Sequence, residues 1–203
     1  MNTPLTALAI SCTLKPSPAA SSSGLLAQQL LDALGEHGVT GDLVRAVDFD
    51  IRPGVENDMG DGDQWPSLRR RVLDADILVF VTPTWMGQHS SVAQRVLERL
   101  DAELSETDEQ GRPILFDKVA IAGVLGNEDG AHHISAILFQ ALNDIGYTIP
   151  AQTSVYWNGE AMQTVDYKDL DETPKAVASA IATATRNAAH LARQLTAQAY
   201  PAE

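Results

Sequence analysis

The sequence predicts an α/β fold in which a doubly wound, five-stranded parallel sheet carries helices on both faces, giving three layers. Two observations support this prediction. Short apolar runs of strand length alternate along the chain with longer segments whose apolar residues recur at helical spacing. No internal repeat or linker-like stretch interrupts this alternation, so we expect residues 1–203 to form a single domain.

Five segments have the composition of strands. The run 76–81 is the clearest, because its β-branched and aromatic residues show no alternation with polar ones, which indicates burial on both faces. The run 42–47 interleaves polar residues and therefore predicts a strand near an edge of the sheet. The complete set of predicted strands is 5–10, 42–47, 76–81, 119–125 and 149–157.

Five segments have the spacing of helices. Leu26, Leu30 and Leu34 recur at intervals of one turn, and Gly35 follows where a helix would end. Pro66 suits the first turn of a helix over 65–74. The complete set of predicted helices is 26–34, 65–74, 92–104, 134–145 and 177–195.

The balance of charge limits the class of partner. The chain has 27 acidic and 14 basic residues and a formal net charge of −13 at pH 7. Nucleic acids and anionic membranes repel such a chain, so we expect neither as a partner. The single cysteine, Cys12, cannot form an internal disulfide. Because there is no signal-peptide pattern and no apolar run of membrane-spanning length, we expect a cytoplasmic protein.

The loop 11–23 follows the first strand, at the edge of the sheet where ligands bind in an open α/β fold. It is rich in hydroxyl groups and carries one cation, Lys15. The first N–H groups of a helix lack internal partners, so Ser21, Ser22 and Ser23 can help to bind a phosphate there. Simple capping of the helix is the alternative. The loop lacks the spacings GxGxxG and GxxxxGK[ST], which disfavours a Rossmann dinucleotide site and a nucleoside triphosphatase.

The loop 82–91 follows the most apolar strand and carries large apolar side chains. Trp85 and Met86 in a loop that faces solvent need a flat surface to cover, while Pro83 restricts the backbone and Gly87 permits close approach. This composition indicates a flat apolar ligand. The alternative is that Trp85 packs on the core or in a dimer interface.

The loop 125–133 follows the fourth strand and contains glycines that suit close contact with a ligand. Its adjacent histidines, His132 and His133, invite a metal site with Glu128 or Asp129. Neighbouring residues of a helix point about 100° apart, so the two histidines are poorly placed to bind one ion and we predict no metal site. A histidine at this position is more often a surface residue or one at a ligand's edge.

Other chemistries are disfavoured. The absence of a G-x-S-x-G motif argues against acyl transfer on an α/β-hydrolase sheet. Asp48 and Asp50 lack the further acid and lysine of a phosphoacceptor pocket. Asp76 precedes a strand and therefore lies at the edge of the sheet opposite to the ligand site, where we expect it to cap a turn.

At the three loops the sequence resembles the flavodoxin-like NADPH-dependent FMN reductases. Thr13 and Lys15 stand where that family has Ser and Arg in its phosphate loop, and 21–23 stand for the family's second hydroxyl cluster. The segment 82–87 is similar to the Thr-Pro-x-(Tyr/Trp)-x-Gly stretch along the flavin ring, and 126–130 stand where the family closes the other side. Two departures, Cys12 in place of Gly and a longer, proline-rich first loop, predict looser phosphate binding.

The resemblance implies bound FMN, with NADPH or NADH as the electron donor and a flavin, a quinone or another small molecule as the acceptor. The flavin carries the electron chemistry, so no catalytic residue is assigned. A homodimer or homotetramer is implied, and Tyr156, Trp157 and Met162 are the apolar residues expected at its interface. The residues expected to bind the cofactor are Thr13, Lys15, Ser21, Ser22, Ser23, Pro83, Thr84, Trp85, Met86, Gly87, Gly126, Asn127, Gly130 and His132.

Two other functions compete with this one. An FMN-binding electron carrier without nicotinamide activity suits the acidic surface, and a scaffold without flavin suits the altered first loop. The acidic segments 51–64 and 105–113 favour the oxidoreductase, because we interpret them as additional walls of a substrate pocket.

Overall fold

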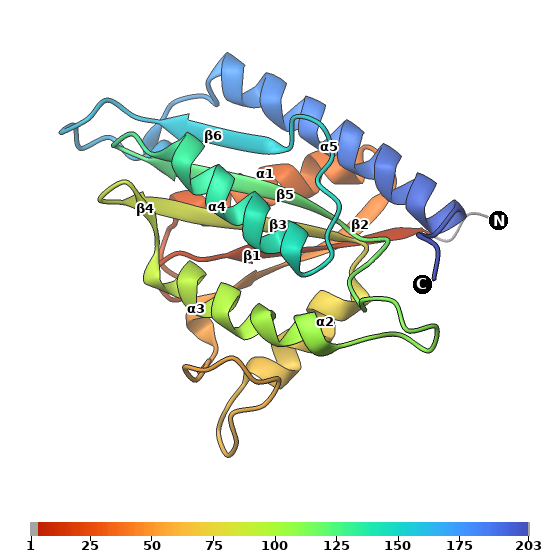
Figure 1. Ribbon diagram of the computed structural model, residues 1–203. Coiled ribbons are helices and arrows are strands. Elements are labelled where there is room, and N and C mark those ends of the chain that lie inside the picture. Colours follow the sequence, from red (N-terminus) through yellow and green to blue (C-terminus); the bar gives the residue numbers. More distant parts are fainter. Residues whose placement is uncertain (1–3, 203) are drawn as a thin grey trace.

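A computed structural model describes residues 4–202, and its centre is a parallel sheet in the order β2-β1-β3-β5-β6 (Figure 1). This arrangement confirms the predicted five-stranded, doubly wound sheet. A sixth strand of two residues, β4, pairs antiparallel with the end of β3 and was not predicted. The strands are β1 (Leu5–Ser11), β2 (Val39–Arg45), β3 (Ile77–Trp85), β4 (Gln88–His89), β5 (Val119–Gly126) and β6 (Ser154–Asn158).

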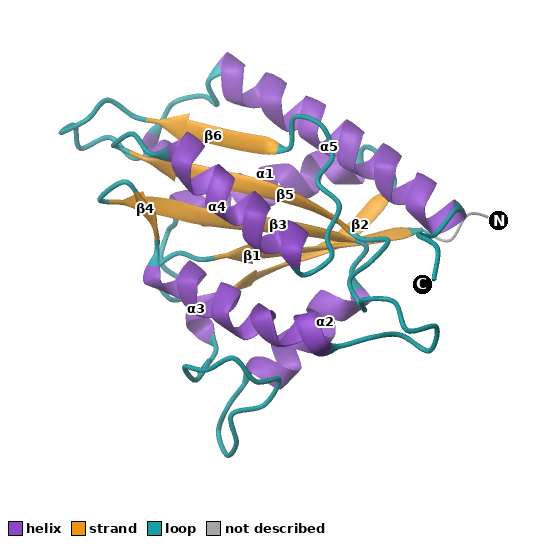
Figure 2. Ribbon diagram, viewed as in Figure 1, coloured by secondary structure: helices purple, strands orange, loops and turns teal. Residues whose placement is uncertain are grey.

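Helices cover both faces of the sheet, as Figure 2 shows. One face carries the first and last helices, and the other carries the three in between. Three short 3-10 helices cover 46–48, 101–105 and 167–169. None of the helices within residues 4–202 combines the length and apolar character needed to cross a bilayer. The helices are α1 (Ser22–Gly35), α2 (Trp65–Asp74), α3 (Ser91–Leu100), α4 (Ala131–Asp144) and α5 (Lys175–Ala197).

Strand β3 shows how the sheet supports two cores. Val79 and Val81 pack against α1 and α5, whereas Leu78 and Phe80 pack beneath α2, α3 and α4. All four side chains are fully buried. Successive residues of a strand point to opposite faces, so a central strand between two helical layers needs an unbroken apolar run. The predicted burial of 76–81 on both faces is confirmed for 77–81.

Two strands differ in their bounds from the prediction. β2 covers 39–45 rather than 42–47, because the chain turns into a 3-10 helix at Ala46. Its position at the edge of the sheet was predicted correctly. β6 covers 154–158 rather than 149–157, because Gln152 takes a left-handed backbone conformation (φ 60°) and the Thr153 hydroxyl bonds to the Pro150 carbonyl in a turn. The predicted helix 92–104 ends at Leu100 and continues as 3-10 helix.

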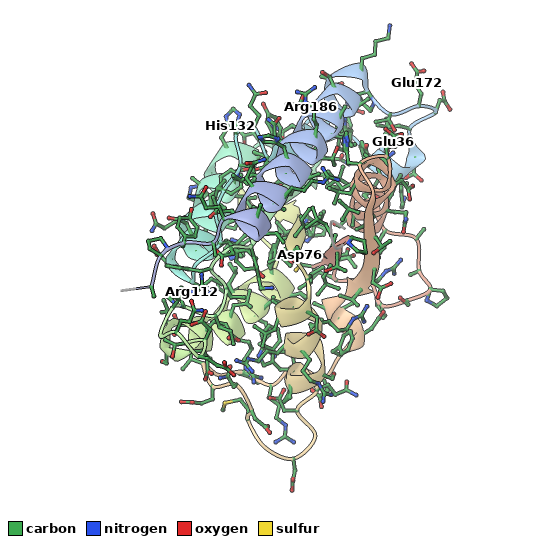
Figure 3. All side chains as sticks on the ribbon, turned by 90° about the vertical axis from the view of Figure 1, so that its right-hand side faces the viewer. Glu36, Asp76, Arg112, His132, Glu172 and Arg186 are labelled. Atoms are coloured by element: carbon green, nitrogen blue, oxygen red, sulfur yellow. The ribbon has the colours of Figure 1, made fainter. Side chains whose placement is uncertain are left out.

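The amino ends of the strands form the face turned toward the viewer in Figure 3, where Asp76 is labelled. The Asp76 carboxylate accepts hydrogen bonds from the Thr6 amide (2.8 Å) and hydroxyl (3.1 Å), so it joins β1 to the start of β3. Asp76 therefore lies at the edge of the sheet that its position in the sequence indicated, but it joins two strands and does not cap a turn.

Tyr200 fastens the segment after α5 to the same end of the sheet. Its amide donates to Asp117 (2.7 Å), its carbonyl accepts from Arg112 (2.9 Å), and its hydroxyl bonds to the Thr148 hydroxyl (2.9 Å). The Tyr200 ring also lies 5.3 Å from that of Phe116, centroid to centroid. These contacts hold the end of the chain beside the start of β5.

Candidate functional site

A pocket lies at the carboxyl ends of β1, β3, β5 and β6, where the strand arrows of Figure 1 point. This is the edge of an open parallel sheet at which ligands bind, and β1 and β3 flank its topological switch point. The pocket brings together the three loops that composition singled out and adds a fourth segment after β6. Its lining residues are Thr13, Leu14, Lys15, Ser21, Ser22, Ser23, Pro83, Thr84, Trp85, Leu125, Gly126, Asn127, Glu128, Trp157, Asp166 and Tyr167.

The first loop is held from outside the pocket by the end of β2. Arg45 donates hydrogen bonds to the carbonyl oxygens of Lys15, Pro16 and Ala19, at 3.2, 3.2 and 2.6 Å. These bonds fix the course of a proline-rich loop that has no regular structure of its own. The loop is therefore braced rather than loose.

Asp48 braces the same loop through Ser17. Its carboxylate accepts bonds from the Ser17 amide (2.8 Å) and hydroxyl (2.6 Å). The bond from the Ser17 hydroxyl is the main reason why the pKa of Asp48 lies below its ordinary value. Asp48 thus has a structural partner, which accounts for this carboxylate without a catalytic role.

The amino end of α1 forms one end of the pocket. Ser21 caps the helix by accepting a bond from the Gly24 amide (3.2 Å), so the alternative of simple capping holds for this serine. Ser22 and Ser23 open the helix and line the pocket beside Lys15. The first amides of a helix and its dipole favour an anion, and a lysine adds a full positive charge. This end of the pocket can hold a phosphate group.

Cys12 does not occupy the pocket. Its side chain is fully buried in the core beneath α2, α3 and α4, and its amide donates to the Val81 carbonyl (2.7 Å). The Ser90 hydroxyl donates to the Cys12 carbonyl (2.6 Å), which ties the first loop to the start of α3. Burial raises the pKa of the Cys12 thiol. A side chain larger than that of glycine at this position therefore takes no space from a ligand.

The second loop is a tight hairpin between β3 and β4. Met86 (φ 53°) and Gly87 (φ 73°) both have left-handed backbone conformations, as the two central residues of a type I′ turn require. Trp85 lines the pocket with 53% of its surface exposed, whereas Met86 is 92% exposed and lines nothing. Trp85 is therefore not a core residue of the chain, and Met86 contributes only its backbone to the turn.

The third loop is pressed against the second. A Cβ atom on Gly130 would lie 2.9 Å from the Cα of Gly87, so only glycine fits there. The Glu128 carboxylate accepts bonds from the amides of Met86 (3.0 Å) and Gly87 (2.9 Å) and also lines the pocket. Gly130 and Gly87 thus shape the wall without lining the pocket themselves. Composition did not identify Glu128 as part of this wall.

The fourth segment, 158–169, was missed because its sequence is polar and has no periodicity. Tyr167 is buried at the base of the pocket, where its ring lies 5.5 Å from that of Trp157 and its hydroxyl donates to Gln29 (2.7 Å). Trp157, which was expected at a subunit interface, lines the pocket. Asp166 completes this side and accepts a long bond (3.4 Å) from the Asn127 side-chain amide.

His132 lies apart from the pocket. Its Nε2 atom bonds to the hydroxyl of Tyr156 (3.1 Å), and the two rings meet edge to face. Neither residue is among those that line the pocket. His133 bonds to the Gln88 side chain instead (3.3 Å). The two histidines have different partners, and within residues 4–202 no group of three or more potential ligands could hold a metal ion.

The acidic segments 51–64 and 105–113 do not line the pocket, contrary to their interpretation as additional walls. They contact each other instead: the Asn57 side-chain amide donates to Glu106 (2.7 Å). Arg69 pairs with Glu103 (2.6 Å) beside this contact. These contacts join the loop before α2 to the segment after α3.

The family model of NADPH-dependent FMN reductases matches residues 5–162. This chain belongs to the NADPH-dependent FMN reductase family. The match covers the sheet and the first three loops of the pocket, and the predicted family resemblance is confirmed.

Two curated proteins are similar to this chain and are longer than the part that it matches. A "divalent metal cation transporter MntH" of Mycobacterium bovis is 43% identical over 169 residues, which are 81% of this chain and 25% of that protein. The 8-demethyl-8-aminoriboflavin-5'-phosphate synthase of Streptomyces davaonensis is 32% identical over 166 residues, 77% of this chain and 65% of that protein. The chain thus spans a quarter of the first and just under two thirds of the second.

Solved structures agree with the family assignment. A crystal structure of RosB with bound 8-demethyl-8-formylriboflavin-5'-phosphate has a TM-score of 0.86 and 30% identity, covering 97% of this chain and 82% of that one. An NADH:FMN oxidoreductase in its apo form has a TM-score of 0.67 over 97% of this chain and 92% of that one, at 16% identity. The second comparison shows the fold alone.

The residues of this pocket fit a flavin phosphate. Two residues of the pocket wall, Thr84 and Asn127, each have a buried oxygen atom without a hydrogen-bond partner among residues 4–202. These atoms are Thr84 Oγ1 and Asn127 Oδ1. Each unsatisfied polar atom costs about 1–3 kcal/mol, so a ligand with polar ring atoms would be favoured beside them. The hydroxyl groups and Lys15 at the other end suit its phosphate. The pocket therefore matches the cofactor that the family name implies.

Proposed function

We propose that the protein binds FMN in this pocket and transfers reducing equivalents from NADPH or NADH to a small acceptor, such as a flavin or a quinone. One observation carries the proposal: a single pocket joins a helix amino terminus rich in hydroxyl groups to a slot between the second and third loops. FMN has a phosphate at one end and a flat ring system at the other, and the two ends of the pocket differ in the same way.

The phosphate end would be formed by Ser22 and Ser23 with the first amides of α1. Lys15 supplies the positive charge, and Thr13, whose hydroxyl accepts a bond from the Lys15 amide (3.2 Å), holds the turn of the loop. The backbone amide of Lys168 donates to the Ser22 hydroxyl (3.3 Å), while its ammonium group pairs with Asp166 and Asp169. Lys15 and the helix dipole therefore supply the positive potential that offsets the repulsion between a phosphate and a chain of net charge −13.

The ring end would be formed by Pro83, Thr84 and Trp85 on one side and by Gly126 and Asn127 on the other. The bound flavin supplies the transfer of hydride and electrons, so the chain needs no acid or base of its own for that step. Its residues orient the ring through backbone and side-chain polar atoms and exclude water with Trp85. We keep the cofactor-binding role proposed for these residues and do not extend it to His132, whose side chain bonds to Tyr156 and does not line the pocket.

Anaerobic flavin titration tests the proposal. The protein is loaded with excess FMN, desalted, and titrated with NADPH and NADH while the visible flavin absorbance is recorded. If the flavin is retained and NADPH or NADH bleaches its absorbance, the result supports the oxidoreductase and identifies the electron donor. Retained flavin that only dithionite bleaches indicates an electron carrier, and a colourless desalted protein indicates a scaffold without flavin.

A second candidate is that a flavin phosphate is the substrate. The similarity to RosB, at 30% identity and a TM-score of 0.86, favours this candidate, because that structure holds a riboflavin-5'-phosphate derivative. Mass spectrometry of flavin recovered after incubation separates the two functions. A recovered flavin of unchanged mass would support a cofactor role, and a changed mass would support a substrate role.

We also propose that the protein is a homodimer or homotetramer. Met86 and Met162 are 92% and 96% exposed, and Tyr156 is partly exposed at the same end of the sheet. Exposed large apolar side chains at one end of a molecule favour a protein contact. Light scattering coupled to size-exclusion chromatography distinguishes a monomer of 21.8 kDa from its multiples.

A further inference from the structure

The tip of the hairpin between β3 and β4 carries two amides that the hairpin itself does not use. In a two-residue turn the N–H groups of the central residues lie outside the strand ladder. Here the two oxygens of the Glu128 carboxylate accept one bond each from Met86 (3.0 Å) and Gly87 (2.9 Å). A side chain from the loop after β5 therefore holds the turn that carries Trp85.

Other contacts make the second and third loops one unit. Gly130 lies directly against Gly87, and the His133 Nε2 atom bonds to the side chain of Gln88 (3.3 Å). Glu128 is the member of this set that also lines the pocket. A change in its carboxylate would thus alter both the hydrogen bonds of the turn and the surroundings of a ligand in the pocket.

The charge of Glu128 has no cationic partner. Asp166, the other carboxylate of the pocket, lies 3.2 Å from Lys168 Nζ, whereas none of the ion pairs within residues 4–202 includes Glu128. Its two oxygens bond to neutral backbone amides only. A negative charge therefore remains in the wall of the pocket, at the end away from Lys15 and the helix amino terminus.

We propose that Glu128 is a positioning residue that fixes the Trp85–Gln88 turn and that its charge makes bound FMN harder to reduce. This inference rests on the proposed function. Reduction adds electrons to the ring system, and a nearby negative charge disfavours a product that gains electron density. The same carboxylate that orders the wall thus lowers the reduction potential of the flavin.

Three variants test the two parts of the inference. Glu128→Gln keeps the shape of the side chain and one acceptor but removes the charge, and Glu128→Ala removes both acceptors. Asp129→Asn is the matched control, because Asp129 is the exposed neighbour of Glu128, carries the same charge and has no hydrogen bond to another part of residues 4–202. Thermal unfolding verifies that each variant is folded.

The first measurement is amide hydrogen exchange by NMR on the protein without flavin. The amides of Met86 and Gly87 are expected to exchange at least tenfold faster in Glu128→Ala than in the wild type, while Asp129→Asn leaves their rates unchanged. Equal rates in Glu128→Ala and the wild type would overturn the positioning role.

The second measurement is the midpoint potential of bound FMN against a reference dye. Glu128→Gln is expected to shift the equilibrium toward reduced flavin by about tenfold, which is ~30 mV for a two-electron couple. An unchanged potential, or an equal shift in Asp129→Asn, would overturn the effect of the charge. If the wild type retains no FMN, the proposed function and the effect on potential both fail, while amide exchange still decides the positioning role.

Discussion

Arg99 and Asp63 form an ion pair with a nitrogen–oxygen distance of 2.8 Å, and neither side chain is exposed to solvent. Arg99 also donates to the backbone carbonyls of Arg52 and Glu56 (3.0 and 2.7 Å). Together with the ion pair, these bonds connect Arg99 of α3 to residues near the start and near the end of the segment 51–64. They attach the segment 51–64, which has no helix or strand, to the body of the protein.

Removing the arginine of this pair should destabilise the fold. We expect Arg99→Met to lower the free energy of unfolding by about 3–5 kcal/mol, because it leaves the Asp63 carboxylate buried without its cation. Urea denaturation measures the change. Arg186→Met removes an exposed arginine of α5 and should change the free energy by less than ~0.5 kcal/mol. Similar losses in the two variants would contradict the special role of the pair.

The same carboxylate predicts sensitivity to acid. Burial alone would raise the pKa of Asp63, but hydrogen bonds from Arg99 and from the amides of Met59, Trp65 and Arg52 outweigh it and hold the pKa well below its ordinary value. Because the unfolded chain takes up this proton at about pH 4 and the folded chain does not, stability present above that pH is lost as the pH falls further.

Denaturation at pH values between about 3 and 6 measures this dependence. The free energy of unfolding of the wild type should fall with decreasing pH. Asp63→Asn should be less stable at pH 6 and show a shallower slope, whereas the exposed control Asp129→Asn should keep the slope of the wild type. An unchanged slope in Asp63→Asn would mean that other carboxylates govern the acid response.

Trp85 and Trp65 offer a matched comparison between a residue of the site and a residue of the core. Trp85 is 53% exposed at the pocket, and Trp65 is fully buried in α2. We expect Trp85→Ala to weaken FMN binding about tenfold with little change in melting temperature. Trp65→Ala should cost about 3–5 kcal/mol of stability. Fluorescence titration and calorimetry measure both, and a Trp85→Ala variant that lost only stability would refute its assignment to the ligand site.

Lys15 should distinguish FMN from riboflavin. Its side chain lines the end of the pocket that suits a phosphate, so we expect Lys15→Gln to weaken FMN binding about tenfold, equivalent to ~1.4 kcal/mol, and to leave the weaker binding of riboflavin unchanged. The exposed Lys175 of α5 provides a charge-matched control in Lys175→Gln. An equal loss for both flavins would place the phosphate elsewhere.

Cys12 should be inert in the folded protein. Its thiol is fully buried and burial raises its pKa, so both access and the thiolate that reacts are lacking. We expect no reaction with a thiol-specific disulfide reagent in native buffer and rapid reaction of one thiol in denaturant. Fast labelling of the native protein would show that the first loop opens.

The fold was predictable because long apolar runs fix the central strands. Every residue of 77–81 is buried, so the whole segment is apolar and is recognisable as a strand from its sequence. The edge strand β2 was harder, since Thr40 to Asp42 are exposed and Gly41 looks like a turn residue. Gly41 nevertheless lies within the strand. A glycine is needed at this position because a Cβ atom there would come within 2.6 Å of the Leu31 side chain of α1. That packing depends on a helix and is invisible in the local sequence.

The pocket was predictable where its residues are next to the ends of apolar strands, as Thr84 and Gly126 are. Glu128 and Tyr167 were not among the residues expected to bind the cofactor, because their roles depend on partners far away in the chain, Met86 and Gln29 respectively. His132 was expected at the cofactor but does not line the pocket, since a position near the third loop does not reveal that the side chain bonds to Tyr156.

The bonds of Tyr200 place the described end of the chain beside the start of β5, opposite to the pocket. Leu5, the first residue of β1, lies at the same end of the sheet, as Figure 1 shows. A fusion partner or an affinity tag joined beside either segment would lie at the edge of the sheet opposite to the pocket. The protein is thus suited to immobilisation on an electrode or a bead with its pocket facing the solution.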